Sequence, residues 1–133
     1  MKQNLDTITG IIVDAAIKVH KVLGPGLLES VYMKALAIEL RKRDLKVELE
    51  VPISADWEGE DLGVAFRADM LVEDLVFVEG KAFEQTANVF LRQLRTHVRL
   101  ANKRVGPLLN FGMALMKDGI VRHIEGFDEA NKD

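Results

Sequence analysis

Three charged residues interrupt apolar segments in the middle of the chain, and their types are those of a hydrolytic metal site. Asp69 stands inside the largely apolar run 66–72, and Glu79 and Lys81 stand two residues apart inside the run 76–82. Residues two apart in a strand point to the same face of a sheet. Burying such charges costs several kcal/mol each unless they are paired or bound to a metal. We therefore expect Asp69, Glu79 and Lys81 to meet in the folded protein.

Two carboxylates and an ammonium group suit the metal-assisted hydrolysis of a phosphodiester. Hard oxygen ligands favour Mg²⁺ (or Mn²⁺), and Mg²⁺ keeps several waters and needs only one or two protein carboxylates. Such a metal neutralises the charge that develops on a phosphate and lowers the pKa of its bound water. Lys81 would orient that water or stabilise the charge that builds on the phosphate. Taken by itself, an Asp…Glu-x-Lys pattern also fits a structural ion pair near a sheet edge.

A separate motif lies in residues 26–32, which read Gly-Leu-Leu-Glu-Ser-Val-Tyr. This segment reproduces the Gly-x-x-Glu-x-x-Tyr signature of the GxxExxY protein family. The Leu-Gly-Pro-Gly of 23–26, the Phe-Arg-Ala-Asp of 66–69 and the Asn-Phe-Gly of 110–112 also resemble that family. The motifs occur in the family's order, and the resemblance covers roughly residues 11–124. The GxxExxY family is placed in the PD-(D/E)XK nuclease superfamily.

The resemblance implies a mixed sheet flanked by helices and a role for each charged residue. Asp69 takes the Asp position, and Glu79 with Lys81 forms the Glu-x-Lys pair. Glu29 is the helix-borne acid that joins them, so the implied metal ligands are Glu29, Asp69 and Glu79. Tyr32 would line the cleft and could stack on bases, but its place on the apolar stripe of a helix makes core packing the better account.

A third motif follows the Glu-x-Lys pair. Nucleases of this superfamily often carry Gln-x-x-x-Tyr on the helix after the catalytic strand, and here Gln93 is followed four residues later by His97. This spacing puts both side chains on one helical face, where they would look into the cleft; a surface or capping histidine is the alternative. A basic stripe on the same helix would grip phosphates, or else forms a solvated face. Its members are Arg92, Arg95 and Arg99.

Two residues depart from the pattern and keep a second function open. Gly80 stands between Glu79 and Lys81, where relatives usually carry a bulky apolar residue, and a glycine can mark a bulge that would displace Lys81. Phe90 stands three residues before the glutamine, where family members commonly have a histidine. The leading hypothesis is a Mg²⁺-dependent nuclease. The alternative is a catalytically inactive nuclease fold that binds nucleic acid or a protein partner.

The elements that must position these residues follow from the spacing of apolar side chains. Amphipathic spacing predicts helices over residues 7–23, 27–43 and 86–101. Alternating or short apolar runs predict strands over 46–53, 62–72, 75–82, 105–111 and 120–124. Pro52 cannot donate to a ladder, so the first strand is expected to lie at an edge or to end there. The order ααβββαββ indicates an α/β or α+β fold with a mixed sheet.

Bulk composition limits these interpretations. The 133 residues fit one domain over 1–133, with a frayed polar tail at 128–133. A content of 48% hydrophobic and 29% charged residues is that of a globular protein rather than a disordered one. The chain has no cysteine, which excludes disulfides and thiolate metal sites. Its net charge of −3 means that nucleic acid would have to be met by a local basic patch.

The expected surroundings are those of a cytoplasmic protein. Charges or glycines break every apolar run well short of roughly 18 residues, so we expect no membrane span. Asp6, Asp14 and Lys18 interrupt any apolar segment of a secretory signal. The expected partner is nucleic acid, with DNA and RNA both open. A homodimer that cuts two strands stays open as well.

Overall fold

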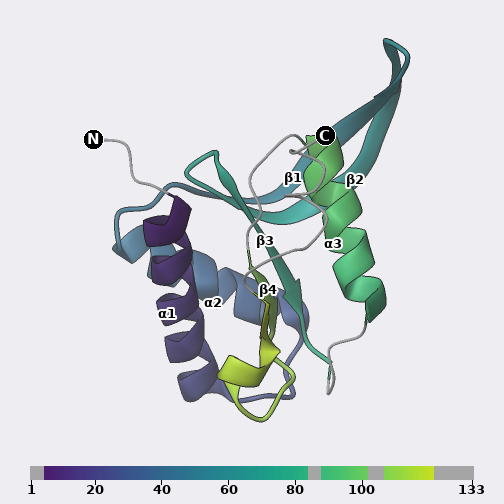
Figure 1. Cartoon of the computed structure of the whole chain (residues 1–133). Helices are drawn as coiled ribbons and strands as arrows, with labels where there is room; N and C mark the ends of the chain where they lie inside the picture. The colour runs from purple at the N-terminus through teal and green to yellow at the C-terminus, as the bar shows by residue number, and fades with distance from the viewer. Residues whose placement is uncertain (1–4, 84–87, 102–106, 122–133) are drawn as a thin grey trace.

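The structure, a computed structural model, describes residues 5–83, 88–101 and 107–121. Within these ranges, helices lie on both sides of a twisted mixed sheet, as Figure 1 shows. The predicted α/β architecture with a mixed sheet is therefore confirmed. The tail 128–133 falls outside the described residues, and so does the side chain of Phe90.

All three predicted helices form: α1 (Leu5–Leu23), α2 (Glu29–Lys42) and α3 (Asn88–Ala101). The turn between α1 and α2 needs backbone conformations that side chains disfavour, because Gly24 and Gly26 adopt φ values of 73° and 102°. The Gly24 N–H donates to the carbonyl of His20 at 2.7 Å and closes the last turn of α1. None of the described helices combines the length and apolar character that a membrane crossing requires.

All five predicted strands are present in the described sheet. Their bounds are β1 (Val47–Trp57), β2 (Glu60–Val72), β3 (Val76–Lys81), β4 (Leu108–Asn110) and β5 (Ile120–Val121). They lie in the order β1-β2-β3-β4-β5, with β3 and β4 parallel and the other pairs antiparallel. A 3₁₀ helix, η1 (Met116–Gly119), precedes β5. The predicted edge position of the Pro52 strand is confirmed, since β1 is the first strand of the sheet.

The hairpin of β1 and β2 is longer than the sequence predicts. Trp57 pairs with Glu60, and the two residues between them, Glu58 and Gly59, both have positive φ values of 50° and 90°. Two such residues make the tight turn whose twist matches that of a hairpin. Because β3 pairs only with residues 70–72 of β2, the outer part of the hairpin is a two-stranded ribbon that projects beyond the sheet (Figure 1).

The sheet separates two clusters of buried apolar side chains. The larger cluster lies between the sheet and helices α1 and α2, and it includes Val78 of β3 and Leu109 of β4. The smaller cluster lies on the opposite face. It consists of Ala68, Leu71, Phe77 and Leu108, with partly buried neighbours such as Phe66. The strands are therefore covered on both faces, which explains why β3 and β4 read as continuous apolar runs.

The two faces change over in the middle of the β1–β2 ladder. Leu49 packs with the larger cluster, whereas Val51, which regular alternation would place on the same face, packs with the smaller one. Their ladder partners behave alike, since Met70 belongs to the larger cluster and Ala68 to the smaller. The cause is Glu50, whose left-handed backbone (φ 54°) breaks the period of two. Side chains at this point can reach the layers on either side of the sheet.

Candidate active site

Asp69 lies between Ala68 and Met70, where the faces of the sheet change over. Its side chain is partly buried, and Oδ2 accepts a hydrogen bond of 3.0 Å from the backbone N–H of Gly80. Along the described strands the β2–β3 ladder begins at the pair of Met70 with Val78. The Asp69 carboxylate therefore continues the link between β2 and β3 beyond the end of the backbone ladder.

Glu79 lies on β3 and is only 8% exposed. Its backbone N–H donates to the carbonyl of Pro107 at 3.2 Å. The pairing of β3 with β4 runs without a break from Glu79 opposite Leu108 to Lys81 opposite Asn110. The strand is regular across the whole Glu-x-Lys motif, so Glu79 and Lys81 share one face, as their spacing predicts.

Gly80 is explained by the close approach of α2 to β3. A Cβ atom at this position would overlap the Sδ of Met33, which is a buried residue of α2. The glycine lets the helix lie against the strand while the strand stays regular. The interpretation of Gly80 as a bulge that displaces Lys81 is therefore wrong.

The backbone of Lys81 is fixed by the segment that follows β4. The Phe111 N–H donates to the Lys81 carbonyl at 2.8 Å. The side chain of Asn110, which is fully buried, accepts hydrogen bonds from the N–H groups of Phe83 at 2.9 Å and Gly112 at 3.1 Å. A buried amide with these partners ties the end of β3 to the chain after β4. Part of the Asn-Phe-Gly motif thus serves to hold the Glu-x-Lys strand in place.

Glu29 is the first residue of α2, and its carboxyl group hydrogen-bonds that of Asp69. Burial and the charge of Asp69 raise the pKa of Glu29 from 4.5 to about 7, while Lys81 acts in the opposite direction. The hydrogen bond to Asp69 and the charge of Glu50 are smaller causes of the same rise in the pKa of Glu29. At neutral pH the Glu29 carboxyl group is therefore protonated for about half of the time.

The pKa of Glu79 is raised from 4.5 to about 8, mainly by burial. The charge of Asp69 is the next cause and that of Glu29 adds to it, while Lys81 lowers the value. The charges of Asp69 and Lys81 thus act on both glutamates, and the charge of Glu29 acts on Glu79. The structure brings together the four residues that the sequence singled out.

His97 reaches the same place from α3. Its ring stacks on Phe66 with centroids 3.9 Å apart and an interplanar angle of 10°, and its Nδ1 lies 3.6 Å from Oε2 of Glu79. Burial lowers the pKa of His97, against the opposing charge of Asp69. At neutral pH this contact joins a neutral imidazole to a largely protonated carboxyl group, so it is not an ion pair.

The other predicted site residues of α3 make no described contact with the carboxyl groups. Gln93 is exposed one turn before His97, and no described contact joins it to the carboxyl groups. Arg92 and Arg99 are exposed as well. Arg95 is partly buried, and its Nε atom makes no hydrogen bond to any described residue. The predicted stripe therefore consists of two exposed guanidinium groups and one that is partly covered.

Tyr32 lies in the hydrophobic core. It is fully buried and stacks on Phe111 with centroids 4.7 Å apart. Its hydroxyl donates to the carbonyl of Gly24 at 2.5 Å and accepts from the N–H of Leu27 at 3.0 Å. The expectation that Tyr32 lines the cleft is thus corrected. Its polar end closes the turn between α1 and α2, and α2 in turn places Glu29.

A model of the PD-(D/E)XK nuclease superfamily matches residues 6–123 of the chain. The chain belongs to this superfamily. Comparison with curated proteins and with solved structures gives no match. The letters of the superfamily name fit Glu79-Gly80-Lys81 as the (D/E)XK element. They fit Asp69 only in part, because Ala68 precedes it where the name has proline.

Glu50 is a further acidic residue beside Glu29 and Asp69, and the sequence reasoning did not single it out. A cleft of about 290 Å³ is lined by Glu29, Glu50 and Asp69 together with Ser30, Met33, Lys34 and Leu49. Regular alternation assigns Glu50 to the solvated face of its strand, and it is exposed in the structure. Its left-handed backbone and its place beside the cleft are not indicated by any pattern in the sequence.

The donor set fits the hard divalent cation that a PD-(D/E)XK site implies. In the parts of the chain that the structure describes, no three acidic or histidine side chains stand close enough to hold one metal ion. Mg²⁺, however, keeps several waters and takes only one or two protein carboxylates. Burial is the main cause of the raised pKa values of Glu29 and Glu79, and the charge of Asp69 adds to both. A cation beside these groups would favour their ionised forms.

Proposed function

We propose that this protein is a Mg²⁺- or Mn²⁺-dependent nuclease of the GxxExxY type that hydrolyses phosphodiester bonds of nucleic acid. The observation that best supports the proposal is the convergence of Glu29, Asp69 and Glu79 near Lys81. These carboxyl groups come from three different elements, α2, β2 and β3. Holding such groups together costs stability, as their raised pKa values indicate. A cation offsets that cost.

Each residue has a defined task in the proposed reaction. Asp69 and one of the two glutamates, Glu29 or Glu79, provide the carboxylate oxygens that hold the cation. The bound cation supplies positive charge that neutralises phosphate oxygens and favours ionisation of the attacking water. Lys81 orients that water and stabilises the charge that builds on the phosphate. Asp69 also keeps β2 and β3 in place through its hydrogen bond to Gly80.

Helix α3 forms the substrate side of the proposed site. Arg92, Arg95 and Arg99 hold backbone phosphates. The Nε of Arg95 is buried without a hydrogen-bond acceptor among the described residues, and a phosphate oxygen would satisfy it. His97 contacts Glu79, whereas Gln93, one turn earlier on the same helix and exposed, meets the substrate.

The proposed substrates are DNA and RNA, and the proposed location is the cytoplasm. The described residues of the site do not decide between the two nucleic acids, so both belong in the assay. A homodimer is part of the proposal for a duplex substrate, since two copies present two sites to two strands.

The test combines metal binding with cleavage. We expect calorimetric titration with Mn²⁺ and Mg²⁺ to give saturable binding to the wild type, and the Asp69→Ala/Glu79→Ala double variant to lose it. Labelled single- and double-stranded DNA and RNA are then incubated with the wild type and with Lys81→Met. Cleavage that requires the metal and falls by at least about a hundredfold in Lys81→Met supports the assignment. A wild type that binds no metal at millimolar concentration would overturn it and would leave an inactive nuclease fold.

A further inference from the structure

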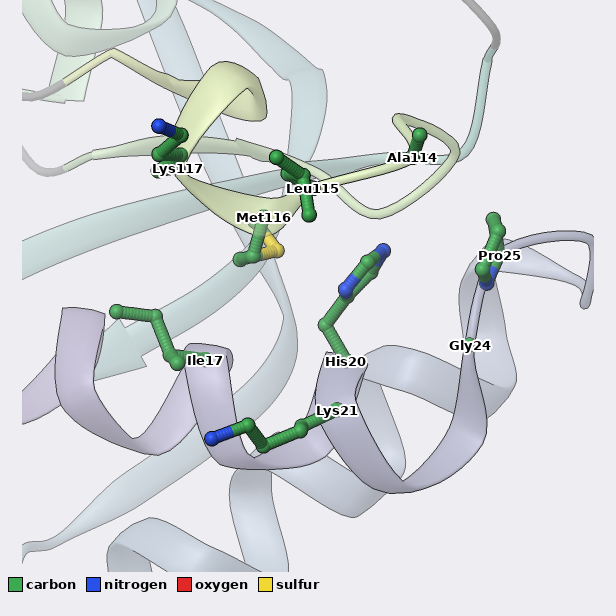
Figure 2. A pocket seen from close by; sticks show the side chains of 9 residues that line it. All are labelled: Ile17, His20, Lys21, Gly24, Pro25, Ala114, Leu115, Met116 and Lys117. Carbon is green, nitrogen blue, oxygen red and sulfur yellow. The ribbon is translucent and has the colours of Figure 1, made fainter.

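A second cavity lies away from the carboxyl groups, between the end of α1 and the segment that contains η1. Figure 2 shows it from close by. It has a volume of about 490 Å³ and is lined by Ile17, His20, Lys21, Gly24, Pro25, Ala114, Leu115, Met116 and Lys117. None of these residues lines the Glu29 cleft. The cavity is therefore a separate feature that the proposed nuclease chemistry leaves unused.

Most of the wall is apolar. Ile17 and Leu115 are large apolar residues that stay 39% and 54% exposed, and Pro25 and the buried Met116 complete the lining. A cavity of this size falls within the range of about 300–1,000 Å³ that small-molecule sites occupy. A ligand with an apolar body would cover surface that is now in contact with water.

His20 supplies a polar group on this wall. It is 7% exposed, and its Nε2 lies 2.8 Å from the carbonyl oxygen of Met113. A carbonyl only accepts, so Nε2 carries the hydrogen, and Nδ1 of the neutral ring is an acceptor. No described residue hydrogen-bonds Nδ1. Figure 2 shows the ring directed from α1 towards Ala114 and Leu115, across the cavity.

The charged residues of the lining are all basic. Lys21 and Lys117 lie at the margin of the cavity (Figure 2), and both are exposed. No aspartate or glutamate is among the lining residues. Apolar walls with two ammonium groups at the margin favour a ligand that is apolar at one end and negatively charged at the other.

We propose that this cavity binds a small amphipathic anion, an organic acid with an aromatic or aliphatic body. The body lies between Ile17, Leu115 and Met116, and the acid group meets Lys21 and Lys117. A hydroxyl or N–H group on the body donates to Nδ1 of His20. The proposal is independent of the nuclease assignment, because the two sites share no lining residue.

The probe for the test is 8-anilinonaphthalene-1-sulfonate, which has an aromatic body, one N–H donor and one anionic group. We expect saturable fluorescence enhancement by the native wild type with one site per chain. Octanoate should displace the probe and octylamine should not, because only the former carries the charge that the lysines meet. In ¹H–¹⁵N spectra of the wild type, the shifts should be confined to the ends of α1 and to residues 111–119. Shifts spread over the exposed ribbon would overturn the proposal.

Two variants sharpen the test. Ala114 is exposed and lines the cavity, so Ala114→Trp should fill the space and weaken probe binding by about tenfold or more. Ala65→Trp, on the exposed ribbon, is the matched control and should leave binding unchanged. The double variant Lys21→Glu/Lys117→Glu should weaken binding of the anionic probe by at least about fivefold and leave binding of the neutral dye Nile red unchanged. The control variant Lys42→Glu should leave the binding of both probes unchanged. Equal binding by all variants would overturn the proposal.

Discussion

The carboxyl group of Glu29, at the first residue of α2, is hydrogen-bonded to that of Asp69, at the point where the two faces of the sheet change over. The start of a helix and a strand of the sheet thus meet at these two carboxyl groups. Both side chains are only partly buried. The cation of the proposed function would bring positive charge to this pair.

Without metal, we expect the protein to become less stable as the pH rises from about 5 to about 8. The folded-state pKa values of Glu29 and Glu79 are raised to about 7 and about 8, above their unfolded values. The folded state therefore keeps protons that the unfolded state has lost, and this contribution disappears as the pH passes through the raised values. The loss should be at least about 1.4 kcal/mol, the equivalent of one pKa unit. Urea unfolding in EDTA at several pH values measures it.

Added Mg²⁺ or Mn²⁺ should reverse this loss at the upper end of the pH range, because the cation binds the ionised carboxylates. Glu79→Gln is the control and should flatten the pH dependence. A wild type whose stability rises steadily over this range in EDTA would contradict the raised pKa values.

Asp69→Asn and Asp69→Ala should separate the structural role of Asp69 from metal binding. An asparagine oxygen can still accept the hydrogen bond from the Gly80 N–H, so Asp69→Asn should fold with nearly wild-type stability while metal affinity falls. Asp69→Ala leaves that N–H without its partner and should cost about 1–3 kcal/mol. Thermal unfolding measures the difference. Equal stabilities for the two variants would mean that the hydrogen bond of 3.0 Å contributes nothing.

Gly80→Ala should destabilise the protein by about 1–3 kcal/mol, because the added Cβ overlaps the Sδ of Met33. Met33→Ala removes the atom that is overlapped. In the double variant the cost of Gly80→Ala should therefore be much smaller than in the wild type, and a double-mutant cycle gives the coupling energy. Additive effects of the two changes would show that the glycine has another cause.

Phe66→Ala should release His97 from the stack that covers it. Since burial is the main cause of the lowered pKa of His97, exposure of the ring should raise that pKa towards 6.5. An NMR titration of the His97 ring protons measures the change. Phe66→Tyr keeps an aromatic ring at 3.9 Å and should leave the pKa of His97 low.

The fold and the meeting of Asp69, Glu79 and Lys81 were predictable because both depend on local patterns, whereas Glu29 was implied by the family resemblance. Apolar spacing determines the helices and strands, and a charge inside an apolar strand needs a partner, which is why Asp69, Glu79 and Lys81 stood out. The same reasoning could not find Glu50, because an exposed glutamate on a strand gives no sign that it lines a cleft. Nor could it explain Gly80, whose cause lies on a different element of the fold.

Tyr32 shows a different limit. A tyrosine on the apolar face of a helix has a ring that belongs in the core and a hydroxyl that needs a partner. Its partners are backbone groups of the glycine-rich turn at Gly24 and Leu27. The sequence contains both the tyrosine and the turn, but only the folded chain shows that they bind each other. Tyr32 thus acts on the site indirectly, because it holds the turn that positions α2 and with it Glu29.

The change of faces also determines where this chain tolerates a change of length. If one residue were added or removed between Leu49 and Val51, every later side chain of β1 would point to the opposite face of the sheet, because side chains alternate with a period of two. At the tip, by contrast, Glu58 and Gly59 connect strands that have no third neighbour among the described strands. A fluorescent label, an affinity tag or a whole inserted domain is therefore best placed between residues 58 and 59, where it leaves both cores and the carboxyl groups untouched.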